Sequence, residues 1–124
     1  MAVYKETIEV KSHGKTPTYI DITKDVRRVI EESGIQNGIC AVISPHITCS
    51  VFFEEFCHDY NEDGDRAALF NGDAHLKSTL LGSSETFEVD NGKLGVGTIG
   101  YVYFADFDRT RPRTRKCKII VLGE

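Results

Sequence analysis

Short apolar segments separated by turn signals constrain the fold of this chain more than any other feature. In the last of them, residues 115–122, the apolar residues Cys117, Ile119 and Val121 alternate against Lys116 and Lys118, which is typical of a strand with one buried face. Comparable segments lie at residues 3–10, 19–22, 38–44, 47–53, 85–89, 93–96 and 98–107. The short connections, including a hairpin-type Asp-Asn-Gly, favour an antiparallel sheet.

Helical spacing of apolar residues occurs in fewer places. Residues 23–34 carry one apolar stripe, with Thr23 placed as N-cap and Gly34 placed to end the helix. Further helices are predicted to begin at Glu54 and to span residues 74–81. The sequence therefore predicts an α+β fold, an antiparallel β-sandwich of seven or eight strands with two or three helices.

Length and charge narrow the function classes. The 124 residues suit a single domain, 1–124, that buries a core of its own. A net charge of −4 argues against a nucleic-acid partner, because such binding requires cations to neutralise phosphates. The chain has neither an apolar stretch near 18 residues nor a signal peptide, so we expect no membrane contact and a cytoplasmic location. The cysteine spacing matches no zinc motif, which favours reduced thiols.

His46 lies where two predicted strands meet, directly after Pro45. Alternation would place His46 and Thr48 on the same face. An imidazole beside a hydroxyl can transfer protons near neutral pH or, when charged, bind a phosphate. The alternative is a histidine that only satisfies hydrogen bonds in the interior.

His75 lies near the start of the predicted helix 74–81, where free amides attract anions, and Asn71 adds a polar group nearby. The alternative is an exposed helix start without a ligand. Together with His46 and His58, His75 also supplies ligand types that suit zinc, although the three are far apart in sequence. Acidic residues between 59 and 65 suit Mg²⁺ or are simply solvated.

An arginine-rich run precedes the last predicted strand. Its members at 109, 111, 113 and 115 alternate, and guanidinium groups suit phosphate oxygens. Such a local basic run fits a phosphorylated small molecule better than a duplex. The alternative is a set of solvated charges that protect a sheet edge.

Four motifs occur together in one order. Residues 44–50 (SPHITCS) resemble a His-Thr-Thr-type segment, and residues 71–82 (NGDAHLKSTLLG) resemble Asn-x-x-Ala-His-Leu-Lys…Gly. Residues 92–98 (GKLGVGT) and 106–113 (DFDRTRPR) complete the set. Together they resemble the YjbQ family, whose members are called secondary thiamine-phosphate synthases.

This resemblance, which covers residues 20–124, implies a homotrimer with ligand sites near its subunit boundaries. The implied reaction joins hydroxymethylpyrimidine diphosphate to a thiazole phosphate and releases pyrophosphate. Such a reaction needs cations around the leaving diphosphate, commonly Mg²⁺ with arginine or lysine. By position, the resemblance assigns His46, Thr48 and His75 to catalysis and Asn71, Arg111 and Arg113 to phosphate.

Three departures from the family pattern accompany the resemblance. Ile47 replaces the middle residue of the His-Thr-Thr segment, and Ile99-Gly100 stands where many members have Trp-Gln. The region before Asn71 is short, so a missing or shortened segment is predicted near residues 65–66. A second hypothesis is that the chain forms a non-catalytic trimeric module that binds a metabolite or a metal. In its metal-binding form, His46, His58 and His75 would hold Zn²⁺.

Overall fold

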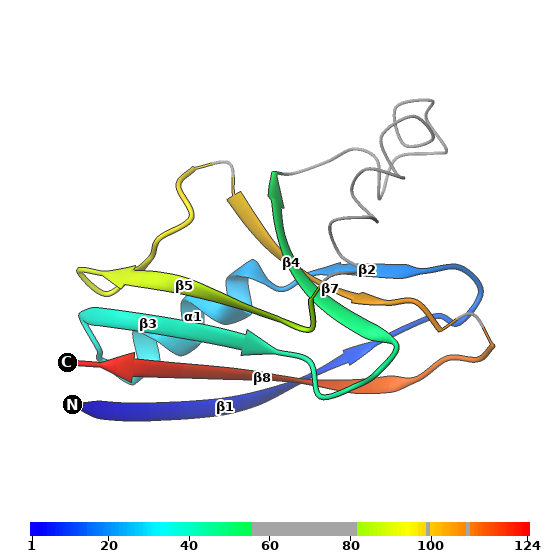
Figure 1. The fold of residues 1–124 in the computed structure, drawn as a ribbon, viewed down its shortest axis with the longest axis horizontal. Helices are drawn as coiled ribbons and strands as arrows, with labels where there is room; N and C mark the ends of the chain where they lie inside the picture. The colour runs from blue at the N-terminus through cyan, green and yellow to red at the C-terminus, as the bar shows by residue number, and fades with distance from the viewer. Residues whose placement is uncertain (56–81, 99, 109) are drawn as a thin grey trace.

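Eight strands and one helix form the described part of the computed structural model, which comprises residues 1–55, 82–98, 100–108 and 110–124. Figure 1 shows how they are arranged. In chain order they are β1 (Ala2–Lys11), β2 (Thr18–Asp21), α1 (Thr23–Ser33), β3 (Asn37–Ile43), β4 (Cys49–Glu55), β5 (Ser84–Asp90), β6 (Lys93–Leu94), β7 (Gly100–Asp106) and β8 (Thr114–Gly123).

The strands form two antiparallel sheets. The larger has the order β1-β8-β3-β5-β6, and the smaller has the order β2-β7-β4. The two ends of the chain pair with each other, because Ala2 of β1 lies opposite Gly123 of β8 (Figure 1). The predicted antiparallel α+β fold is therefore confirmed, and eight strands agree with the number expected.

One core connects the two sheets with α1. Val26, Val29 and Ile30 of the helix are buried in the same cluster as Cys117 of β8 and Phe104 of β7. Burying an aliphatic side chain of this size contributes roughly 1.5–3 kcal/mol. The helix lies behind the larger sheet in Figure 1. The amphipathic stripe predicted from the sequence is therefore the surface that fixes α1 to both sheets.

The turn signals of the sequence are largely confirmed. Asn91 and Gly92 have φ values of 52° and 76°, as a tight β5–β6 hairpin requires, and Gly34 ends α1 at φ 71°. Thr23 is not the N-cap but the first helical residue. Asp21 takes over part of the capping role, since its Oδ1 accepts the Thr23 N–H at 2.9 Å.

The helix predicted to begin at Glu54 is wrong at its start, because β4 continues as far as Glu55. Pairing with β7, in which Glu54 lies opposite Tyr101, outweighs the local helical preference. The predicted helix 74–81 lies outside the described residues. Within the described part of the chain, α1 has 11 residues and no helix is long and apolar enough to cross a membrane.

The strand β7 is buried on both faces. Val102 and Phe104 enter the main core, whereas Tyr103 and Ala105 join Phe52 in a second cluster. The rings of Phe52 and Tyr103 stack with centroids 5.2 Å apart. As a result, the end of β7 at Asp106 lies deep in the protein and is 1% exposed, which matters for the site described next.

Candidate functional site

The connection between β3 and β4 forms one wall of a surface pocket. Its volume is about 510 Å³, a size that suits a small molecule. Residues Ser44, Pro45, His46, Ile47, Thr48, Cys49, Ser50, Gly82, Ser83 and Phe107 line it. Five of these residues carry a hydroxyl or imidazole group, so the lining combines hydrogen-bonding groups with one aromatic ring.

The wall begins where Pro45, which has no N–H for a sheet ladder, interrupts the strand. Ser44 donates its N–H to the carbonyl of Ser83 at 2.7 Å, and its Oγ accepts the His46 N–H at 3.2 Å. The following residue, Ile47, is fully exposed, and β4 starts only at Cys49. The predicted break at Pro45 is therefore confirmed, and the turn, residues 44–48, presents its side chains beside the pocket.

His46 is anchored to β8 through its ring. The backbone N–H of Lys116 donates to Nε2 of His46 at 3.0 Å. A ring nitrogen that accepts a hydrogen bond has no proton, so this contact engages the lone pair of Nε2. His46 thus lines the pocket in a fixed orientation, with Nδ1 as its other polar atom.

Thr48 is fixed from both its backbone and its side chain. Its carbonyl accepts the Phe107 N–H at 3.0 Å, and its Oγ1 accepts a hydrogen bond from Nη2 of Arg115 at 2.9 Å. His46 and Thr48 both line the pocket, but so does Ile47, because residues 46–48 form a turn in which the predicted strand alternation does not apply. The arginine behind Thr48 belongs to β8 and lies 67 residues further along the chain.

Arg115 is held by two aspartates. Its Nε donates to Oδ2 of Asp106 at 2.8 Å, and its Nη2 lies 3.5 Å from Oδ2 of Asp108. Arg113 pairs with the same Asp108 oxygen at 3.0 Å through Nε. Two cations therefore face two anions, and the group is close to neutral at the pH where all four are charged.

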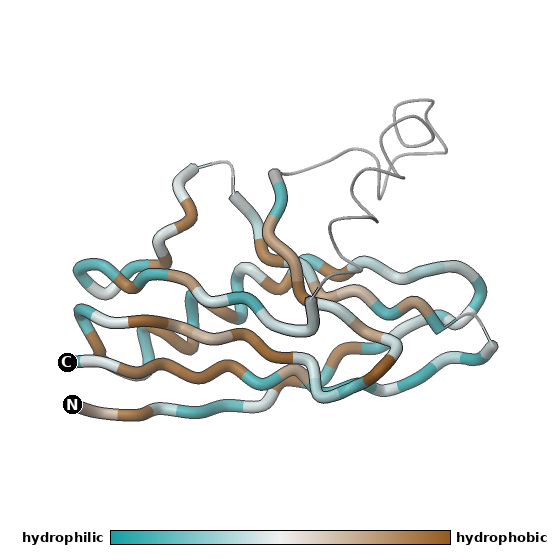
Figure 2. The backbone as a smooth tube through the Cα atoms, in the orientation of Figure 1, coloured by the Kyte–Doolittle hydropathy of each residue, from teal (hydrophilic) through white to brown (hydrophobic). Residues whose placement is uncertain are grey.

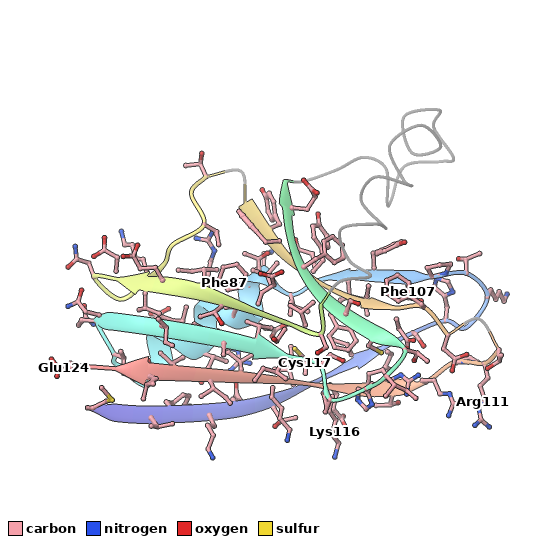
Figure 3. The ribbon with its side chains drawn as sticks, viewed as in Figure 1. Phe87, Phe107, Arg111, Lys116, Cys117 and Glu124 are labelled. Atoms are coloured by element: carbon pink, nitrogen blue, oxygen red, sulfur yellow. The ribbon has the colours of Figure 1, made fainter. Side chains whose placement is uncertain are left out.

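The two arginines that the sequence predicts as phosphate ligands lie in different surroundings. Arg113 is engaged with Asp108, and Arg111 is exposed at the end of the molecule opposite Glu124 (Figure 3). Neither residue lines the pocket. The backbone of Arg111 lies against Gly14, where a Cβ atom would be 2.1 Å from the Arg111 carbonyl carbon. Their role as phosphate ligands stays a prediction.

The electrostatics of the aspartates follow from these bonds. Burial alone would raise the pKa of Asp106, but hydrogen bonds from Arg115 and from the Asp108 N–H hold it below its ordinary value. Hydrogen bonds from the hydroxyl and N–H of Thr110, reinforced by Arg113, lower the pKa of Asp108 to about 2. Both carboxylates are therefore charged at neutral pH, as the pairing requires.

Cys49 also lines the pocket, but its thiol is protonated at neutral pH. Burial raises the pKa of this thiol to about 11, and the neighbouring Asp106 carboxylate adds to the effect. A protonated thiol forms only weak hydrogen bonds, so Cys49 offers a ligand little polar contact. The described cysteines 40, 49 and 117 are all free.

A metal centre is not supported by the residues that the structure describes. Among them there is no group of three or more histidine, cysteine, aspartate or glutamate side chains that could hold an ion. Of the histidines predicted as zinc ligands, only His46 is described, and its Nε2 already accepts a hydrogen bond. His58, Asn71 and His75 lie outside the described residues, so their roles stay predictions.

The pairing of Asp106 with Arg115 was not predicted from the sequence. A signal existed, because the aspartates at 106 and 108 and the arginines at 113 and 115 have the same two-residue spacing on either side of one connection. Side chains two apart on extended segments share a face, so the two pairs can meet. Arg115 in turn contacts the pocket lining through its hydrogen bond to Thr48.

Comparison with known proteins gives one consistent result. A UPF0047 protein of Methanothermobacter thermautotrophicus is 34% identical over 139 aligned residues, covering 100% of this chain and 95% of the relative. The UPF0047 protein YugU of Bacillus subtilis is 32% identical, with coverage of 95% and 98%. The crystal structure of a YbjQ-like protein of unknown function from Sulfolobus solfataricus superposes with a TM-score of 0.75 at 29% identity, covering 99% of each chain.

The family model agrees with these relatives. It is described as UPF0047 protein YjbQ-like and matches residues 6–68 and 56–124, which together span nearly the whole chain. The two matches overlap between residues 56 and 68. The fold, the motifs and the relatives therefore lead to one conclusion: this chain belongs to the YjbQ (UPF0047) family.

Proposed function

We propose that this protein binds a phosphorylated small molecule in the pocket beside His46 and Thr48. The observation that carries the proposal is the hydrogen bond from Arg115 to Thr48, which places a cation directly behind a hydroxyl of the pocket wall. Hydroxyl groups supported by a guanidinium suit phosphate oxygens. Phe107, on the same lining, offers an aromatic surface for a flat ring.

The specific reaction we propose is of the thiamine-phosphate synthase type. A thiazole nitrogen attacks the methylene carbon of hydroxymethylpyrimidine diphosphate, so that a C–N bond forms while the C–O bond to the diphosphate breaks and pyrophosphate leaves. Mg²⁺ bound to the diphosphate would neutralise its charge. His46, Thr48 and His75 are the proposed catalytic residues, and Asn71 with the arginines would hold phosphate.

Incubation of the purified protein with both substrates and Mg²⁺ tests this reaction. We expect thiamine phosphate and an equal amount of pyrophosphate, with product lost in His75→Ala and lowered in Thr48→Val. Thr114→Val is the matched control, because it removes an exposed hydroxyl on β8 that does not line the pocket. The catalytic proposal fails if no product forms above background, or if His75→Ala remains fully active.

Binding without catalysis is the second candidate, and one observation favours it. The Nε2 lone pair of His46 accepts the Lys116 N–H, so this nitrogen does not serve as a general base while that bond holds. A protein that binds the substrates with saturation, yet forms no product, would have this function. Metal analysis of the purified protein tests its metal-binding form, for which stoichiometric zinc that is lost in His46→Ala is the expected result.

Assembly into a homotrimer is part of the proposal. The outer face of the larger sheet carries Val3 and Ile39, which are 59% and 46% exposed, beside the part-buried Ile120 and Leu122. Register places Val3 and Ile39 on either side of Leu122. Figure 2 shows hydrophobic residues along β3 and the C-terminal half of β8. An apolar patch of this kind is suited to burial against another subunit.

Light scattering during size-exclusion chromatography tests the trimer. We expect a particle of three times the 13.9 kDa chain mass, and dissociation when Ile39→Lys places a charge on the apolar face. Lys118→Ala, an exposed change on the same face of β8, is the control that should stay trimeric. A monomeric wild-type protein would overturn the trimer.

A further inference from the structure

The geometry points to a pocket wall that acts as a hydrogen-bond donor surface: His46 donates through Nδ1 and Thr48 through its hydroxyl to oxygens of the bound ligand, with Arg115 and Asp106 as positioning residues. The inference rests on the proposed function for the class of ligand, a phosphorylated small molecule. It goes beyond that function by stating which atoms recognise the phosphate and which residues orient them.

The ring of His46 is anchored on β8 by one hydrogen bond. A backbone N–H can only donate, so the Lys116 contact of 3.0 Å requires Nε2 of His46 to be the acceptor. The proton of the neutral ring is then on Nδ1. None of the described side chains or carbonyls accepts a hydrogen bond from Nδ1. Because His46 lines the pocket, a ligand oxygen is the fitting partner for this proton.

Thr48 follows the same logic. A guanidinium has donors and no acceptor, so the 2.9 Å contact with Arg115 uses a lone pair of Oγ1 and leaves the hydroxyl proton for another acceptor. Within the described residues, the acceptor within reach of that proton is the Cys49 sulfur at 4.0 Å, which is a weak acceptor. A phosphate oxygen in the pocket is a far stronger one.

Asp106 and Arg115 orient these donors. Asp106 is 1% exposed and Arg115 is 14% exposed, so the pair is nearly dry. The planar guanidinium extends from the buried carboxylate, at 2.8 Å, to Thr48, at 2.9 Å, and thereby fixes the hydroxyl. Because Asp106 balances the charge of Arg115, recognition depends on aligned donors and less on net positive charge.

The same geometry separates an oxyanion from a metal ion. A metal binds lone pairs, whereas an oxyanion binds protons on donors. The Nε2 lone pair of His46 and one lone pair of Thr48 are already used by Lys116 and Arg115. Binding of zinc at Nε2 would require the Lys116 hydrogen bond to break, so this wall suits phosphate oxygens.

Two measurements test the inference. Long-range ¹⁵N–¹H NMR of the free protein reports which ring nitrogen of each histidine carries the proton, and His46→Asn assigns the His46 signals. We expect a protonated Nδ1 and an unprotonated Nε2. A proton on Nε2, or displacement of the Lys116 amide when Zn²⁺ binds through Nε2, would overturn the inference.

The second measurement is calorimetric titration with inorganic pyrophosphate. His46→Asn can keep an N–H near the position of Nδ1, whereas the amide of His46→Gln reaches the position of Nε2 and leaves no donor near Nδ1, so we expect His46→Asn to bind more tightly. Thr48→Val should weaken binding roughly tenfold, as the loss of a bond to a charged group implies, whereas Thr48→Ser and the control Thr114→Val should bind as the wild type does. Equal affinity of both histidine variants, or wild-type affinity in Thr48→Val, would overturn the inference.

Failure of the proposed function can be distinguished from failure of the inferred donor surface. If the wild-type protein does not bind pyrophosphate, the proposed function falls. If it binds but the His46 proton is on Nε2, the proposed function survives and the donor surface falls. Asp106→Asn supplies the readout for positioning, because it keeps the shape of the side chain and removes only the charge that pairs with Arg115. The folded variant should bind pyrophosphate more weakly than the wild type, and wild-type affinity would overturn the positioning role.

Discussion

Arg115 donates a hydrogen bond from Nη2 to Oγ1 of Thr48 at 2.9 Å, although 67 residues separate them in the chain. The same guanidinium pairs with Asp106 at 2.8 Å. Arg115 belongs to the five-stranded sheet and Asp106 to the three-stranded sheet, so the contact joins both sheets to the turn that forms the pocket wall. Stability and the proposed ligand recognition therefore depend on the same contacts.

Asp106→Asn is expected to destabilise the fold by up to about 3 kcal/mol, because it removes the closer partner of a nearly buried ion pair and leaves Arg115 only the longer 3.5 Å contact with Asp108. Urea denaturation measures this change. Asp25→Asn is the control, since Asp25 forms an exposed pair with Arg28 at 3.6 Å and should cost less than about 1 kcal/mol. Equal destabilisation by the two variants would contradict a special role for Asp106.

Acid should weaken the arginine–aspartate group in a defined range. Hydrogen bonds from Thr110 and Arg113 lower the pKa of Asp108 from 3.8 to about 2 in the folded protein. A lowered folded pKa gives stability that is present above 3.8 and is lost as the pH falls towards 2. The melting temperature should therefore fall between pH 5 and about 2. This fall should be smaller in Asp108→Asn than in the wild type. If Asp108→Asn has the same pH dependence of thermal unfolding as the wild type, this explanation is refuted.

Two glycines with similar backbone angles should differ in their response to substitution. Gly14 and Gly34 have φ values of 79° and 71°. A Cβ at Gly14 would lie 2.1 Å from the Arg111 backbone, whereas nothing lies within 4 Å at Gly34. Gly34→Ala should cost about 1–2 kcal/mol from the left-handed conformation alone.

Gly14→Ala should cost clearly more and should also weaken pyrophosphate binding, because it pushes away the segment that leads to Arg113 and Arg115. Chemical denaturation and calorimetry of both variants check this comparison. Similar stability of the two variants would show that the close approach between Gly14 and Arg111 does not constrain the loop.

Three thiols should be slow to alkylate while the protein is folded. Burial raises the pKa of Cys40 and Cys117 to about 12 and that of Cys49 to about 11. The thiolate is the reactive form, so little of it is present at pH 8. Peptide mapping after iodoacetamide treatment should show modification of these three residues only once denaturant is added. Rapid labelling of Cys49 in the folded protein would contradict its burial.

Local features of the fold were predictable because each depends on a few neighbouring residues. The hairpin at Asn91-Gly92 follows from the tolerance of these residues for positive φ, and the end of α1 follows from Gly34. The helix expected from Glu54 failed because pairing of β4 with β7 is a long-range interaction. The strand period also does not show that β7 is buried on both faces, where Val102 and Tyr103 both lie in the interior.

The site was predictable only in part. The break at Pro45 identified the turn that carries His46 and Thr48, since a strand interruption is visible in the sequence. The partners Lys116 and Arg115 were not predictable, because the register between distant strands and the crossing of two sheets decide which side chains meet. The strand period gives the face of a residue, but it does not give the partner on the other sheet.

A pyrophosphate titration followed by ¹⁵N–¹H correlation NMR tests the central claim most directly, because each backbone amide reports on its own surroundings. The account predicts saturable shifts that are largest at residues 44–50 and Phe107, and that are reduced in Thr48→Val. Shifts confined to a second surface pocket, lined in part by Arg27, Gln36 and residues 91–94, or no saturable shift at all, would contradict it.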